Sequence, residues 1–173
     1  MLKVIIVREK NCNFAVSKKN SLKFLINSLL FMAKNQSKDL HDTSLLYEMF
    51  QTFNRLCFNS ELPDCEIKVG RKSSDGCCRI KGNHCQIIIS RRFEWTKENL
   101  ETIMLHEMTH LYIGNVLKIY FDGLFGHGWV FKYFWLKFWV KYGINIFRFV
   151  KPKKSTLKLN IDIWLGKLLD FFF

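Results

Sequence analysis

The stretch His106-Glu107-Met108-Thr109-His110 is an HExxH motif, and it decides how the rest of the chain is interpreted. Residues four apart lie on the same face of a helix, so the two histidines can bind one metal ion. Glu107 would then lie beside the fourth coordination position, where it can take a proton from water and return it to a leaving amine. The motif therefore predicts a hydrolytic zinc site on a helix.

The residues around the motif favour one amphipathic helix over about residues 96–113. Thr96 is a suitable N-cap, acidic residues follow in the first turns, and Gly114 comes after the last periodic position. Apolar residues recur at intervals of three and four: Leu100, Ile103, Met104, Met108 and Leu111. An unpartnered carboxylate is costly to bury, so Glu107 between two histidines favours a metal site over a pair of core histidines.

A third ligand is needed, because a catalytic zinc ion normally has three protein ligands and one open position. No glutamate occurs after Glu107, which excludes a ligand glutamate on a later helix. The HExxHxxGxxH spacing also fails, because Ile113 and Val116 stand where Gly and His are required. His127 is the only histidine beyond the motif and is the predicted third ligand, with Asp122 as the weaker candidate.

The remaining pattern predicts an α+β fold with a short antiparallel sheet packed on helices. We expect helices over residues 43–59 and 128–142, the latter ended by Gly143. Strands are expected near 65–70, 77–82 and 85–90, with a hairpin turn at 81–84. Upstream, residues 2–7 are typical of a strand, the apolar run 24–33 of a short helix, and about 34–42 of a polar linker. Residues 24–33 also loosely resemble a signal peptide, but they start late and lack a clear cleavage site.

Several short motifs follow one another in a fixed order: Phe58-Asn59, Glu61-Leu62-Pro63, Gly76-Cys77-Cys78, Ile87-Ile88-Ile89-Ser90, the HExxH motif and His127-Gly128-Trp129-Val130-Phe131. As an ordered set, these motifs resemble the SprT-like family of zinc metalloproteases over roughly residues 42–150. Two positions depart from the family, since Val130 replaces a frequent acidic residue and Trp129 is bulkier than usual. The frequent C-terminal zinc ribbon is also missing, because the chain contains no CxxC pair.

The resemblance implies a small zincin-like domain of the minigluzincin type. It implies that His106, His110 and His127 bind zinc and that Glu107 is the catalytic base of an endopeptidase. It further implies protein substrates that are associated with DNA or crosslinked to it, and hence a role in DNA repair. Residues 1–41 would be an N-terminal extension, 42–150 the metalloprotease domain and 151–173 a basic and apolar tail.

Composition fits one small intracellular enzyme. A chain of 173 residues with 49% hydrophobic content can bury one core. The six cysteines include an adjacent pair and have no secretory context, so we expect reduced thiols and a cytoplasmic location, or the nucleus in a eukaryote. The aromatic run 129–140 is interrupted by Lys132 and Lys137, so no membrane association is expected.

The net charge of +12 is concentrated at both ends of the chain. Residues 1–60 carry nine basic and four acidic groups, 61–110 eight of each, and 111–173 ten basic and three acidic. Basic flanks favour a DNA partner, single-stranded or duplex, although an AT-rich genome would also enrich lysine. Trp129, Tyr133, Trp135 and Trp139 could stack on unpaired bases, but we expect core packing for most of them.

Two functions therefore remain open. The first is a zinc endopeptidase acting on protein or peptide substrates near DNA. The second is a non-catalytic nucleic-acid-binding module with a structural zinc, for which Cys77, Cys78 and His84 could approach the metal. A general base at Glu107 has a use only in the enzyme. The strand at 85–89 is expected to be a free edge that pairs with an extended peptide.

Overall fold

The computed structural model describes residues 42–82, 84–123, 126–147 and 150. The expected strand 2–7, helix 24–33, most of the linker and the tail from 151 lie outside the described residues. The elements in chain order are α2 (Thr43–Cys57), β1 (Glu66–Gly70), β2 (Gly76–Lys81), β3 (His84–Ser90), α3 (Lys97–Leu111), the π-helical turn η1 (Tyr112–Val116) and α4 (Trp129–Tyr142).

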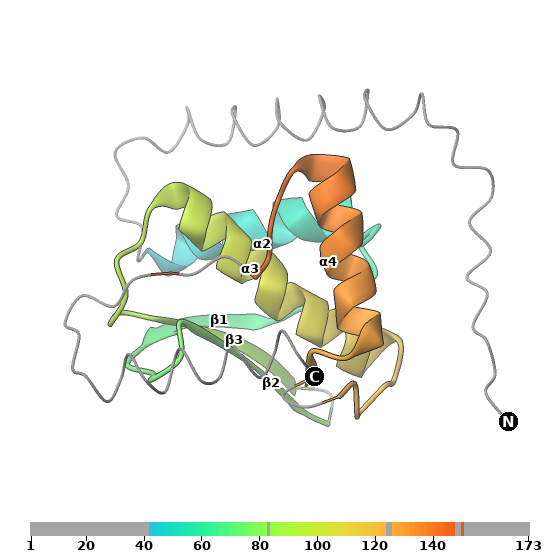
Figure 1. Ribbon diagram of the computed structural model, residues 1–173. Helices are drawn as coiled ribbons and strands as arrows, with labels where there is room; N and C mark the ends of the chain where they lie inside the picture. Colours follow the sequence, from blue (N-terminus) through green and yellow to red (C-terminus); the bar gives the residue numbers. More distant parts are fainter. Residues whose placement is uncertain (1–41, 83, 124–125, 148–149, 151–173) are drawn as a thin grey trace, which may run out of the picture.

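The α+β class is confirmed, with the helices gathered on one side of a small sheet (Figure 1). Helix α3 supplies much of the core that fills the space between the layers. Its fully buried apolar side chains are Leu100, Met104, Leu105, Met108 and Leu111. These residues follow the three- and four-residue spacing of the sequence, and they fix which face of α3 turns away from solvent.

The sheet is mixed, so the expectation of a purely antiparallel sheet is wrong. Its order is β1-β3-β2, with β2 antiparallel and β1 parallel to the central strand β3. The hairpin at 81–84 is present, since Lys81 pairs with His84. The connection from β1 to β2 passes across the end of β3, where the N–H groups of Ser90 and Arg91 donate to the carbonyls of Asp75 and Gly70. The connection from β1 to β2 is short in sequence, yet it joins the two outer strands of the sheet.

The predicted peptide-binding edge is also wrong, because β3 has a neighbour on each side. The outer strands of this sheet are β1 and β2. The last residue of β2 leads into the β2–β3 hairpin. The first residue of β2, Gly76, lies against α3, because a Cβ at this position would come within 2.9 Å of Ile103 Cγ1. The outer strand that lies beside the HExxH helix is thus β2.

Helix α3 begins as predicted, with the Thr96 hydroxyl accepting a hydrogen bond from Asn99 N–H. Its α-helical part ends at Leu111, and the chain continues as η1 up to Val116. Helix α4 also agrees with the sequence, since it ends at Gly143 in the left-handed conformation (φ 72°). Both helices thus begin within one residue of the predicted start, and the α-helical part of α3 ends two residues before the predicted end.

The expectation that most of the α4 aromatics pack in the core is wrong for three of four residues. Trp129, Tyr133 and Trp139 are 87%, 48% and 53% exposed, and only Trp135 is half-buried. The core face of α4 is instead formed by Phe131, Phe134, Phe138 and Tyr142. These residues recur at intervals of three and four, so they occupy one face of the helix, and the tryptophans lie on its other faces.

Candidate metal centre

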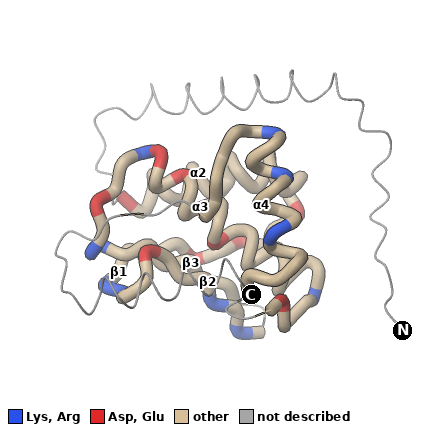
Figure 2. Tube along the Cα trace, in the orientation of Figure 1, with Lys and Arg blue, Asp and Glu red and all other residues tan. Residues whose placement is uncertain are grey.

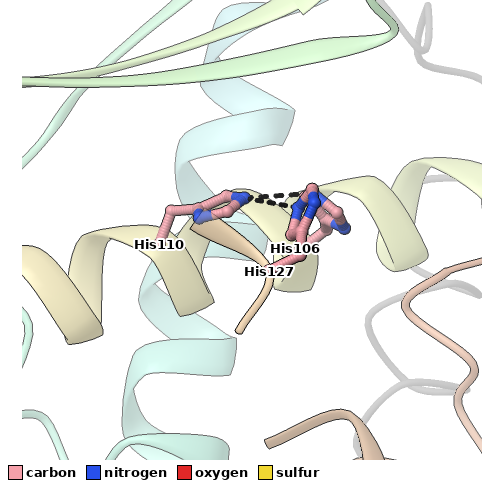
Figure 3. Close-up of side chains that lie close together, drawn as sticks. All are labelled: His106, His110 and His127. Atoms are coloured by element: carbon pink, nitrogen blue, oxygen red, sulfur yellow. Dashed lines mark hydrogen bonds between the residues drawn. The ribbon is translucent and has the colours of Figure 1, made fainter. Parts of the chain in front are cut away.

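The structure brings together the three histidines that the sequence singled out. His106 and His110 lie one turn apart on α3, and His127 directly precedes Gly128, the N-cap of α4. The Nε2 atoms are 3.2 Å apart for His106 and His110, 3.0 Å for His110 and His127, and 3.1 Å for His106 and His127. Figure 3 shows the ring nitrogens pointing toward one another.

This arrangement fits a metal ion. In a tetrahedral site with Zn–N distances of about 2.0–2.1 Å, ligand nitrogens are about 3.3 Å apart, close to the observed separations. The Nδ1 atom of His106 lies 2.9 Å from the carbonyl oxygen of Ile146, which can only accept, so Nδ1 is the donor; in a neutral imidazole Nε2 then presents a lone pair. Three converging nitrogens of this kind could bind one metal ion together.

The surroundings keep His110 neutral, as a metal ligand must be. Burial is the main cause that holds the pKa of His110 well below its usual range, and the neighbouring His106 and His127 lower it further. The ring of Phe131 packs against all three imidazoles, with centroid distances of 4.9 Å to His106, 4.7 Å to His110 and 4.5 Å to His127. An apolar wall of this kind excludes water from one side of the cluster and strengthens interactions within it.

His127 is held by contacts that the sequence did not reveal. The carboxylate of Asp122 accepts hydrogen bonds from the N–H groups of Val130 (3.2 Å) and Phe131 (2.7 Å). It therefore caps the first turn of α4, although Asp122 precedes the N-cap residue Gly128 by six positions. The carbonyl oxygen of Asp122 accepts a hydrogen bond from the N–H of Gly128. A Cβ at Gly128 would collide with Asp122, so the two residues lie in close contact. Asp122, the weaker ligand candidate, therefore fastens the loop that carries His127.

Glu107 is buried beside the cluster, against strand β2. A Cβ at Gly76 would lie 2.5 Å from Glu107 Oε1, so the absent side chain leaves the room that this carboxylate fills. Burial raises the pKa of Glu107 to about 8, with Asp75 acting in the same direction and the N–H of Cys78 opposing them. A cation at the adjacent histidines would favour the ionised carboxylate.

The histidine cluster is self-contained within the described residues. Only His106, His110 and His127 form a group of three or more His, Cys, Asp or Glu side chains close enough to share an ion there. Cys77, Cys78 and His84, which were considered as further ligands, are not part of it. The described cysteines are all free thiols.

The fold and the cluster define a small α+β domain with a three-histidine site of the kind that can hold a metal ion. A family model described as "SprT-like family" matches residues 46–145, more than half of the chain, and the protein belongs to this family. The comparison with curated proteins finds no match. No helix in the described part of the chain is long and apolar enough to cross a membrane.

Proposed function

We propose that the protein is a zinc-dependent endopeptidase. The observation that carries the proposal is the position of Glu107, a buried carboxylate on the same helix as two of three converging histidines. A structural zinc site is usually closed by a fourth protein ligand and has no use for a base. Among the described residues, the cluster of side chains close enough to share an ion has three members, which supports an open position over the structural alternative.

In this proposal His106, His110 and His127 would hold a zinc ion, which would supply polarisation of the scissile carbonyl and a more acidic water. Glu107 takes the proton from the attacking water and delivers it to the leaving amine. His106, His110 and His127 each direct a ring nitrogen at one point, and Phe131 shields that point on one side. Gly76 and the N–H of Cys78 hold the carboxylate of Glu107 in place.

We further propose that the substrate is an extended peptide that pairs with β2. This strand is paired on one side only in the described sheet, and its first residue contacts Glu107. Main-chain hydrogen bonds to an outer strand bind a peptide with little dependence on its side chains. Such binding would suit a protease that acts on varied proteins.

The test is degradation of casein by purified protein, with self-cleavage as a second assay. A chelator should abolish cleavage, and one equivalent of zinc should restore it, because three neutral imidazoles bind this ion well. Cleavage that persists without metal would contradict the proposal. Tight zinc binding without cleavage of any substrate would favour the structural alternative.

We propose DNA as the partner that brings this protease to its substrates. The net charge of +12 supports it, and so does α4, which carries Lys132, Lys137 and Lys141 and no acidic residue (Figure 2). Exposed Trp129 and Trp139 on the same helix could stack on unpaired bases. Lys151, Lys153 and Lys154 lie at the start of the basic tail and are further candidates for contacts with phosphates, although they fall outside the described residues.

The salt dependence of the affinity for DNA tests this proposal. Each neutralised phosphate contributes a slope of about 0.9 in log affinity against log salt on duplex and about 0.7 on single strands. Replacing Lys151, Lys153 and Lys154 together should make the slope shallower by roughly two to three units without altering zinc content. An unchanged slope would remove this segment from the interface. Absence of binding at low salt would remove DNA altogether.

A further inference from the structure

The segment that follows α4, residues 145–147, lies against the metal centre although it is distant from the HExxH motif in sequence. The Ile146 carbonyl oxygen is 2.9 Å from Nδ1 of His106, forty residues earlier. The ring of Phe147 packs edge-on against the rings of His106 and His127, with centroids 6.3 Å and 5.7 Å apart. The segment therefore touches one candidate ligand through its backbone and two through an aromatic side chain.

The backbone contact determines which nitrogen of His106 faces the cluster. A neutral imidazole carries one proton, and a carbonyl oxygen can only accept it. Because Nδ1 donates to Ile146, Nε2 is left with the lone pair that a metal requires. The same bond fixes the rotation of the ring, since turning it away would leave a part-buried donor without its acceptor.

Asn145 holds this segment in place. Its Oδ1 atom accepts hydrogen bonds from the indole Nε1 of Trp135 and from the N–H of Phe147, both at 3.0 Å. Two donors converge on one atom, which identifies that atom as the amide oxygen. One bond ties the segment to α4, and the other closes a turn around Ile146, whose side chain is 2% exposed. The direction of the Ile146 carbonyl thus depends on the Asn145 side chain.

We infer that residues 145–147 set the tautomer and orientation of His106, with Asn145 as the positioning residue that raises the affinity of the three histidines for zinc. The consequence for zinc affinity rests on the proposed function, whereas the tautomer is a property of the metal-free protein. Partners of ligand histidines typically change metal affinity by about 10–100-fold when they are altered. Asn145 acts through the Ile146 carbonyl, so we expect about tenfold.

Three variants separate this role from a general effect on stability. Asn145→Leu removes the acceptor at similar volume, whereas Asn145→Asp keeps oxygen acceptors at an exposed position and should retain the affinity. The matched control is Asn99→Leu near the start of α3, because Asn99 Oδ1 has no hydrogen-bond partner among the described residues. Zinc affinity is measured by competition with a chromophoric chelator, and folding is followed by circular dichroism.

The expected result is a zinc dissociation constant about tenfold higher for Asn145→Leu and nearly unchanged for Asn145→Asp and Asn99→Leu. Long-range ¹H–¹⁵N correlation spectra of the metal-free protein should show neutral His106 with its proton on Nδ1, and a mixture of tautomers in Asn145→Leu. Equal affinity of the Leu and Asp variants, or a proton on Nε2 in the unmodified protein, would overturn the inference. A protein that binds no zinc would refute the proposed function, while the tautomer would still decide the role of the segment.

Discussion

Helix α3 and the loop 117–128 deliver their histidines to the same point by different physical means. On α3, His106 and His110 converge because four residues complete about one helical turn, whatever the rest of the fold does. In the loop, His127 arrives through tertiary contacts, chiefly the carboxylate of Asp122 on the first turn of α4. Two of the candidate ligands are thus placed by local helix geometry, and the third is placed by tertiary contacts.

The difference implies that the two regions fail in different ways. A change on α3 away from the ligands should leave their spacing intact, because the helix is buried and makes its own hydrogen bonds. A change that loosens the loop should move His127 alone and weaken the site without removing any ligand atom. Variants of the two regions should therefore lose different properties of the site.

Glu107→Gln should reduce proteolysis by about 10²- to 10⁴-fold and leave zinc binding unchanged. The amide keeps the volume of the buried side chain but cannot take a proton from water. Zinc content is measured by atomic emission and activity by casein cleavage. Loss of zinc in parallel with activity would show that Glu107 supports the site structurally.

His127→Ala should weaken zinc binding by roughly a hundredfold. Zinc binding to four protein ligands is worth about 10–16 kcal/mol, or roughly 3 kcal/mol per ligand, which is about a hundredfold in affinity. His84→Ala is the matched control, because its side chain is 67% exposed and lies outside the cluster. If His127→Ala binds zinc as well as the unmodified protein does, the loop contributes no ligand.

Gly76→Ala should reduce proteolysis by roughly ten- to a hundredfold with zinc retained, because the new Cβ displaces Glu107. A displacement of about 1 Å at a reacting group can cost on the order of a hundredfold. Gly70→Ala in β1 is the control, since its Cβ would meet only the Ile88 side chain at 3.3 Å. Full activity of Gly76→Ala would mean that α3 positions its base without help from the sheet.

Asp122→Ala and Thr96→Ala compare the two regions most closely, because each removes a carboxylate or hydroxyl cap from one helix. Both should lower the free energy of unfolding by about 1 kcal/mol, as lost N-caps do. Only Asp122→Ala should also weaken zinc binding, by roughly fivefold, since Asp122 fastens the loop of His127. Equal zinc affinity of the two variants would show that the loop holds its shape without this carboxylate.

The sequence predicted those features that depend on neighbours along the chain. The cap at Thr96, the left-handed end of α4 at Gly143 and the spacing of the two α3 histidines follow from local rules. His127 could be named because few histidines were available, and the structure brings it to within 3.0 Å of His110. Elimination identified the residue, but it said nothing of how the loop reaches α3.

Features that depend on distant contacts were missed or predicted wrongly. The parallel pairing of β1 with β3 and the central position of β3 arise from a connection that crosses a strand, which alternation of residue types does not encode. The roles of Asp122, Gly76 and Ile146 depend on atoms 8 to 40 residues away in sequence. An aspartate six residues before a glycine N-cap was the one available signal for the loop, but Asp122 was considered only as the weaker candidate for the third metal ligand.

The central claim is that His106, His110 and His127 bind one zinc ion and leave a position open. X-ray absorption at the zinc edge of the purified protein tests this most directly. The account predicts one zinc per chain, with nitrogen and oxygen neighbours at about 2.0–2.1 Å, three of them imidazoles, and no sulfur neighbour. A sulfur shell at about 2.3 Å, or four imidazoles around the ion, would contradict it.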